Sequence, residues 1–195
     1  IFDVGQVLVD YDWETYLDSF GFEPAKRERI AKATFQSPVW DERDRGLYEE
    51  DVYLKQFQEL DPEDAEDIEK VIRGTGGTIH KRPYADTWVK YLKSKGYHVY
   101  ILSNYSSYML DHTKKELTFR REMDGEVFSC YAKQLKPDAE IYQIILNKYQ
   151  LKPEECVFID DRSENCRGAQ EQGIHTICFK DFKQVTADLE KLGVK

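Results

Sequence analysis

Short apolar runs alternate with amphipathic helical patterns from about Val89 to the end of the chain. Phe2 belongs to one strand at the start of the chain, and the apolar runs predict four more strands at residues 99–102, 126–130, 156–159 and 175–179. The helical patterns cover residues 85–95, 138–150, 163–172 and 181–192. Strands that alternate with helices of about 10–15 residues are typical of βαβ units, so this part of the chain predicts a parallel sheet.

The stretch from residue 12 to residue 82 has a different pattern, with no convincing buried strand. Its amphipathic segments predict helices at residues 13–20, 23–35, 49–60 and 63–73. We therefore predict an α/β fold, with a Rossmann-like parallel-sheet core and a small helical cap inserted after the first strand. The core is expected to comprise residues 1–11 and 83–195, and the cap residues 12–82.

Composition and charge narrow the classes of function. With 195 residues, 41% of them hydrophobic, the chain can bury a core without disulfides. Its net charge of −9 argues against binding to nucleic acid or to an anionic membrane surface. The same charge suits a divalent cation held by carboxylates, whereas an anionic substrate needs a locally basic site. No apolar run approaches the roughly 20 residues that span a bilayer, so we expect no membrane association.

Cysteine usage indicates the redox environment. The cysteines form no CxxC pair, and no histidine stands at zinc-ligand spacing from them. Free thiols beside apolar runs are typical of a reducing compartment, so we expect a cytoplasmic protein. The chain begins inside a predicted strand, at Ile1, so we expect native residues before it, and no signal peptide is visible.

Polar side chains gather at the predicted carboxyl ends of the strands, which is where open parallel sheets bind ligands. A carboxylate there can attack phosphorus and form an acyl phosphate. Two further carboxylates can hold Mg²⁺, while a lysine and a hydroxyl can bind phosphoryl oxygens. The residues that provide this set are Asp3, Ser103, Asn104, Lys136, Asp160 and Asp161.

Taken together, these segments resemble the four motifs of the haloacid dehalogenase (HAD) superfamily, in order and spacing, over the whole chain. Residues 2–8 are similar to the first motif, Ser103 closes the second, Lys136 is the third, and residues 158–161 begin the fourth, with Asn165 at its trailing polar position. Within the superfamily the chain is most similar to bacterial α-glucose-1-phosphate phosphatases and to the phosphatase domain of soluble epoxide hydrolases. Residues 135–142 carry that closer match.

The resemblance implies a role for each matched residue. Asp3 is expected to attack the phosphoryl group, with Ser103 and Asn104 binding the transferring oxygens. Lys136 is expected to neutralise charge on the phosphate and to orient Asp3. The metal ligands are expected to be Asp3, the Gly5 carbonyl, Asp161 and, through water, Asp160. The implied function is Mg²⁺-dependent hydrolysis of a small phosphorylated metabolite, with a sugar phosphate as one candidate.

The chain departs from the family pattern at Gly5. HAD phosphatases commonly place a second aspartate there, which protonates the leaving group, and acid–base help of this kind contributes roughly 10²–10⁴-fold in rate. A good leaving group, a cap residue or a bound water would make up for the loss. In the cap, the segment around Trp40, Arg43 and Arg45 resembles the substrate-facing segment of the family. These three residues are candidate substrate contacts, against the simpler interpretation of solvated or ion-paired arginines.

Two other functions compete with phosphatase activity. A haloacid dehalogenase would use Asp3 to displace halide from carbon, but it needs no metal, which leaves Asp160 and Asp161 without a purpose. A non-catalytic domain that binds a phosphorylated ligand would explain Gly5, although Asp3, Lys136 and their partners are intact. The sequence does not fix the substrate or the oligomeric state.

Overall fold

The computed structural model describes residues 1–194, and it has a five-membered parallel sheet at its centre. Strand β3 (Tyr100–Ser103) pairs with β4 (Gly125–Phe128), and β5 (Val157–Asp160) pairs with β6 (His175–Cys178), both in parallel. Phe2 lies between the two pairs and bridges Ile101 and Ile159, also in parallel. The resulting order is β4, β3, the segment at Phe2, β5, β6. The predicted α/β fold with a parallel sheet is confirmed.

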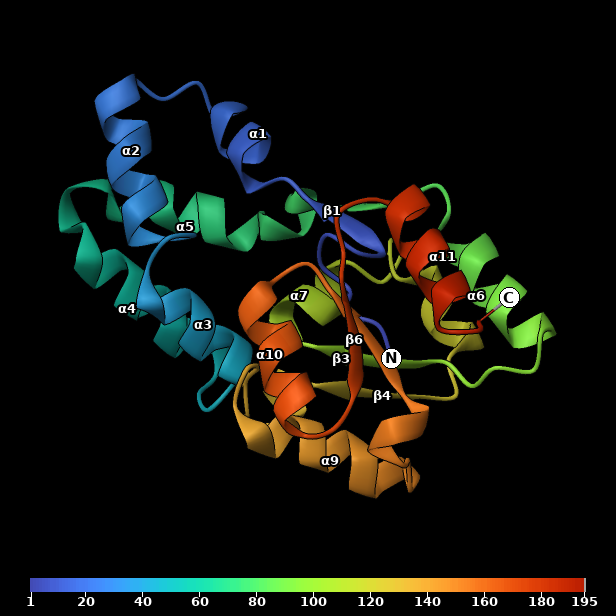
Figure 1. Cartoon of the computed structure of the whole chain (residues 1–195). Coiled ribbons are helices and arrows are strands. Elements are labelled where there is room, and N and C mark those ends of the chain that lie inside the picture. Colours follow the sequence, from blue (N-terminus) through green and yellow to red (C-terminus); the bar gives the residue numbers. More distant parts are fainter. Residues whose placement is uncertain (195) are drawn as a thin grey trace.

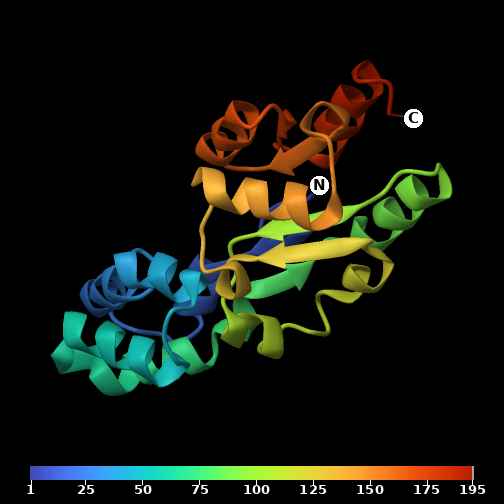
Figure 2. The ribbon, with the colours of Figure 1, turned by 90° about the horizontal axis from the view of Figure 1, so that it is seen from below.

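Helices cover both faces of this sheet. Successive side chains along each strand point to opposite faces, and the apolar side chains on each face are buried by helices. On one face, α6 (Ala85–Ser94) and α11 (Phe182–Lys191) pack against Phe2, Ile101 and Ile159. On the other, α9 (Ala139–Tyr149) and α10 (Ser163–Glu171) pack against Leu102 and Phe158. Figures 1 and 2 show these helices on the two sides of the sheet, and one apolar cluster fills the space between the sheet and the helices on each side.

Five helices form a separate lobe, called here the cap lobe. Figure 2 shows the strand arrows of the sheet pointing towards this lobe. Its apolar side chains make a third cluster that includes Leu17, Ile30, Phe57 and Ile68. The helices are α1 (Trp13–Asp18), α2 (Pro24–Ala33), α3 (Pro38–Arg45), α4 (Glu50–Leu60) and α5 (Ala65–Arg73).

A short antiparallel ribbon connects the cap lobe to the core. Strand β1 (Val9–Tyr11) leads into the lobe and β2 (Ile79–Lys81) leads out, with Val9 opposite Lys81. The expectation of no buried strand between residues 12 and 82 was therefore wrong, since Ile79 is buried in β2. Three residues are too few to show the alternation by which a strand is detected in a sequence.

Three short helices were also absent from the sequence prediction: α3, α7 (Ser107–His112) and α8 (Ser129–Ala132). The strand expected at residues 126–130 ends at Phe128, and the chain turns into α8. Helix α3 ends where Gly46 takes the left-handed conformation (φ 70°), and there the cap lobe meets the core. The Ser129 hydroxyl donates a 2.6 Å hydrogen bond to the Asp44 carbonyl, and Lys133 binds the Gly46 carbonyl. Among the helices of residues 1–194, none is long and apolar enough to cross a membrane.

Candidate active site

An ion-paired cluster lies at the carboxyl ends of the central strands. The Lys136 ammonium is 2.8 Å from Asp3 Oδ1 and 2.5 Å from Asp160 Oδ2. Asp3 follows the strand residue Phe2, and Asp160 is the last residue of β5, so the sheet itself brings the two carboxylates together. The side chains of Lys136 and Asp160 are 1% and 0% exposed, so the pair is shielded from water.

Asp160 is held by a complete set of donors. Besides Lys136, its carboxylate accepts hydrogen bonds from the Arg162 backbone N–H at 2.8 Å and from Asn165 Nδ2 at 3.0 and 3.1 Å. Asn165 lies in the first turn of α10, directly after the loop that carries Asp161. These bonds fix Asp160 behind the site, whereas Asp161 lines the cleft in front of it.

Asn104 fixes the loop that carries the lysine. Its side-chain amide donates to the Lys136 carbonyl at 3.0 Å, and its Oδ1 accepts from the Lys136 N–H at 2.8 Å. This reciprocal pair joins the end of β3 to the loop before α9. Asn104 lines the cleft as well, but both ends of its amide are occupied by the backbone of Lys136.

Burial and charge set the protonation of the cluster. Burial raises the pKa of Asp3, against the opposing effects of Lys136 and of a hydrogen bond from Ser103. Burial, together with the charges of Asp3 and Asp160, raises the pKa of Asp161 to about 6. Burial lowers the pKa of Lys136, but the two carboxylates beside it outweigh that effect and raise it, so Lys136 is a cation at neutral pH.

The carboxylates meet the requirements of a hard divalent cation. One oxygen from each of Asp3, Asp160 and Asp161 lies within 4.8 Å of the other two. Lys136 compensates only part of their charge, so a cation with oxygen ligands would offset the remainder. Gly5 lines the cleft beside them, and a Cβ on it would meet just one neighbouring atom within 4 Å, Asp3 Oδ2 at 4.0 Å. The donor set therefore fits Mg²⁺.

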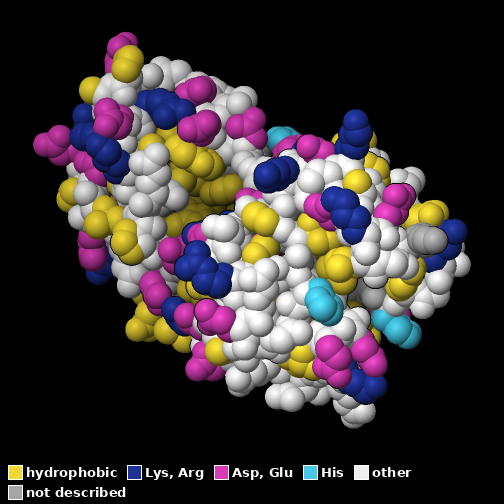
Figure 3. Space-filling view, viewed as in Figure 1, with side chains coloured by type: hydrophobic (Ala, Val, Ile, Leu, Met, Phe, Trp, Pro, Cys, Tyr) yellow, Lys and Arg dark blue, Asp and Glu magenta, His cyan; other side chains and the backbone are white. Residues whose placement is uncertain are grey.

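A cleft of about 500 Å³ opens from this cluster towards the cap lobe. Figure 3 shows hydrophobic side chains in the hollow between the cap lobe and the rest of the molecule. Aromatic rings form much of the wall: Tyr11 stacks on Trp40 with ring centres 6.0 Å apart, and Phe35 lies 5.1 Å from Trp40. The charged groups in the lining are Asp3, Asp41, Asp44, Lys136, Asp161 and Arg162.

The three cap residues singled out from the sequence have different positions. Trp40 lines the cleft. Arg43 does not: it is 1% exposed, forms two hydrogen bonds to Glu50 at 2.6 and 3.0 Å, and lies over the Trp40 ring. Arg45 is also outside the cleft lining, and it pairs with Glu42 at 3.3 Å.

Two cleft residues were not expected from the sequence. Asp44, near the end of α3, is half-buried, and its carboxylate accepts a hydrogen bond from the Ser106 backbone. Burial raises its pKa to about 7. Tyr11, in β1, has a buried hydroxyl that makes no hydrogen bond with residues 1–194. The segment around Trp40 resembles the substrate-facing segment of the family, but nothing in the sequence distinguishes Asp44 from its charged neighbours on the same helix.

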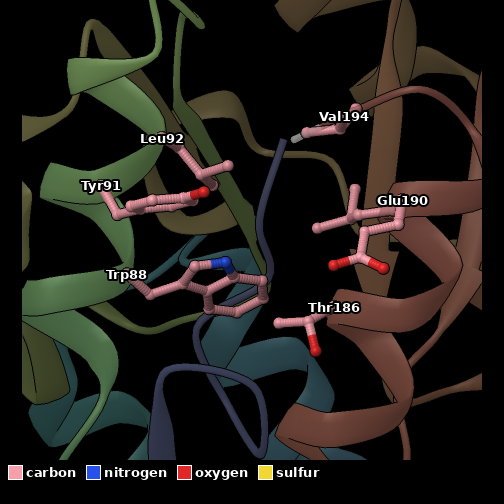
Figure 4. Close-up of a pocket in the computed structure, with 7 residues that line it drawn as sticks. Trp88, Tyr91, Leu92, Thr186, Glu190 and Val194 are labelled. Atoms are coloured by element: carbon pink, nitrogen blue, oxygen red, sulfur yellow. The ribbon is translucent and has the colours of Figure 1, made fainter.

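A second cavity, of about 510 Å³, lies far from this chemistry, between α6 and α11 (Figure 4). Trp88 and Leu92 face Thr186 and Glu190 across it. Its described lining carries one carboxylate and no basic group, so it does not suit a phosphate ester.

The family model of haloacid dehalogenase-like hydrolases matches residues 2–173. The chain belongs to this family. The resemblance seen in the sequence is thereby confirmed, and the HAD-like chain is a hydrolase.

Its relatives include phosphatases. A sesquiterpene phosphatase of Aspergillus oryzae is 25% identical over 98% of this chain and 94% of its own length. Bifunctional epoxide hydrolase 2 of Rattus norvegicus is 30% identical over 52% of this chain, and the match spans only 19% of that protein. A HAD family enzyme of Bacteroides thetaiotaomicron, crystallised with magnesium and inorganic phosphate, has the same fold, with a TM-score of 0.74, 22% identity and coverage of 94% and 96% of the two chains.

Proposed function

We propose that the HAD-like chain hydrolyses phosphate monoesters with Mg²⁺ and an aspartyl-phosphate intermediate on Asp3. The observation that carries this proposal is the bridge that Lys136 makes between Asp3 and Asp160, with Asp161 beside them at the floor of the cleft. It combines a nucleophile, a phosphate-neutralising cation and a metal-binding carboxylate in one place.

Each residue of the site has a separate role in the proposed reaction. Asp3 attacks phosphorus, and Lys136 and Ser103 bind the transferring oxygens. Asp3, Asp161 and the Gly5 carbonyl hold Mg²⁺, and Asp160 supports the site from behind through Lys136 and Asn165. The metal supplies charge neutralisation for the phosphoryl oxygens when it is bound. Asn104 keeps Lys136 in place through its two bonds to the lysine backbone.

The cleft favours a substrate with an apolar or aromatic leaving group. Trp40, Tyr11 and Phe35 present flat apolar surfaces above the site. Asp41 and Asp44 in the same wall disfavour further negative charge away from the reacting phosphate. A sugar phosphate, which the sequence suggested, can stack on an aromatic ring and stays within this class of small phosphorylated metabolites. One full-length relative is a sesquiterpene phosphatase, which is consistent with an apolar leaving group.

The competing functions have less support. Halide displacement by Asp3 needs no metal ion, so it leaves Asp161 without a role. Burial and the charges of two neighbouring carboxylates raise the pKa of Asp161, and a bound metal ion would offset those charges. A non-catalytic domain would not need Lys136 buried between two carboxylates, which is a costly arrangement.

The test is hydrolysis of an aryl phosphate, an alkyl phosphate and sugar 1- and 6-phosphates, with and without Mg²⁺. We expect activity that needs Mg²⁺ and is abolished in Asp3→Asn. Asp10→Asn is the matched control, because Asp10 pairs with Arg82 outside the cleft and should leave turnover unchanged. Folded protein that binds Mg²⁺ but hydrolyses none of the esters would refute the proposal.

A further inference from the structure

The site has a small open space beside Gly5, the position at which the family pattern commonly has a second aspartate. A cavity of about 80 Å³ lies beside Gly5, and Gly5, Asn104 and Tyr105 of the core form part of its wall. The cap side of the wall includes Asp44 and Trp40. Gly5 has no side chain to place in this space, and the carboxylic acid in its lining is Asp44 of the cap lobe.

Asp44 belongs to the cap lobe but is anchored to the core. Its carbonyl accepts the Ser129 hydroxyl at 2.6 Å, and the next turn of chain is held by Lys133 at the Gly46 carbonyl. Gly46 itself packs tightly, since a Cβ there would lie 3.0 Å from the Cα of Cys130. Asp44 therefore keeps a defined position relative to the core, as acid–base chemistry requires.

The groups around Asp44 allow its carboxyl to carry a proton near neutral pH. Burial raises its pKa to about 7, and the charges of Asp41 and Asp3 act in the same direction. Arg43 and the Ser106 N–H act in the opposite direction, but Arg43 is itself paired with Glu50. The remaining titratable neighbours are the phenols of Tyr11 and Tyr105 and the thiol of Cys130, whose pKa values burial raises above their ordinary range.

We propose that Asp44 is the acid–base residue of the reaction, acting on the substrate from the cap side of the space beside Gly5. This inference rests on the proposed phosphatase function. As Asp3 forms its bond to phosphorus, the bond to the leaving oxygen breaks, and that oxygen takes the proton of the Asp44 carboxyl. In the second step water attacks phosphorus, its proton passes to the Asp44 carboxylate, and the bond between phosphorus and Asp3 breaks. The alcohol and inorganic phosphate leave, and both carboxyl groups return to their starting states.

The test compares leaving groups, because a poor leaving group needs the proton and a good one does not. In Asp44→Asn, the rate constant of the first chemical step should fall about 10²–10⁴-fold for an alkyl phosphate and change little for a nitrophenyl phosphate. That step is read from the burst of released nitrophenol. Glu42→Gln removes the same charge from the same helix outside the cleft, and it should leave both substrates unaffected. Asp44→Glu should restore part of the alkyl phosphate activity.

Three results separate the possibilities. Equal loss in the first chemical step on both substrates, with no recovery in Asp44→Glu, would reduce Asp44 to a positioning residue and overturn the proposal. A leaving-group-dependent loss in Tyr11→Phe but not in Asp44→Asn would assign the proton to the phenol instead. Failure of the proposed function is distinguishable from both, because the unmodified chain would then hydrolyse neither ester.

Discussion

Replacement of Lys136 by methionine tests the electrostatics on which the site depends. Methionine keeps most of the unbranched stem and removes the charge. In the folded protein the ammonium lies 2.8 Å from Asp3 and 2.5 Å from Asp160, and the two carboxylate side chains are 10% and 0% exposed. Without the cation, two buried carboxylates have no compensating charge.

The size of the expected loss in unfolding free energy follows from the burial of these charges. Removing one partner of a buried ion pair typically costs about 3–5 kcal/mol in free energy of unfolding, because the remaining charge is left buried. Lys152→Met is the matched control: Lys152 is 66% exposed and pairs with Glu155 on the surface, so its loss should cost about 0–1 kcal/mol. The double variant Lys136→Met with Asp160→Asn should recover part of the stability and none of the activity.

The loss of stability in Lys136→Met should also depend on pH. Burial raises the pKa of Asp3 even with Lys136 present, and removal of the cation raises it further. A folded-state pKa above the unfolded one means that the folded state binds more protons, so the variant gains stability as pH falls. Urea unfolding followed by tryptophan fluorescence should therefore give a deficit, relative to the unmodified chain, that is larger at pH 7.5 than at pH 5. A deficit equal to that of Lys152→Met, or one independent of pH, would refute the reasoning.

Two further predictions concern packing and the cap lobe. In Gly168→Ala the new Cβ would lie 2.6 Å from the Pro137 carbonyl oxygen, so a clash of about 1–3 kcal/mol should outweigh the gain in helix propensity of about 1 kcal/mol. Unfolding measurements should show lower stability. Turnover should be slower, because Pro137 directly follows Lys136 and its displacement moves the lysine. A more stable variant would contradict this. In the cap lobe burial opposes ionisation of Asp64, but its pairs with Lys26 and Arg29 outweigh burial and hold its pKa below the ordinary value. Asp64→Asn should therefore cost about 1–3 kcal/mol at pH 6, and the difference should shrink as pH falls through the lowered pKa of the folded state, whereas a difference that stays constant under acid conditions would count against the pairs.

The sequence predicted the sheet and the position of its chemistry because both depend on local pattern. Asp3 and Asp160 were found since each directly follows an apolar run that ends at the same edge of a parallel sheet, and Asp161 is the next residue after Asp160. Asp44 could not be found in this way, because its burial arises only when α3 docks beside Ser129, about 85 residues later in the chain. Arg43 shows the converse: its charge and motif suggested a substrate contact, but it packs over the Trp40 ring and is buried in an ion pair with Glu50.

The separation of the apolar clusters has a consequence for the cooperativity of unfolding. The cluster of the cap lobe, which runs from Leu17 to Ile72, is distinct from the two clusters around the sheet. Both ends of the lobe meet at the β1–β2 ribbon, so α2, α4 and α5 can open and reclose at a small entropic cost without separating any pair of sheet strands, while the end of α3 stays bound to Ser129. We therefore expect native-state hydrogen exchange to reveal two units, with amides of α2, α4 and α5 opening at lower free energy than those of β3 and β5. Asp3 would then keep its surroundings in the core while the wall of the cleft that the cap lobe provides is open.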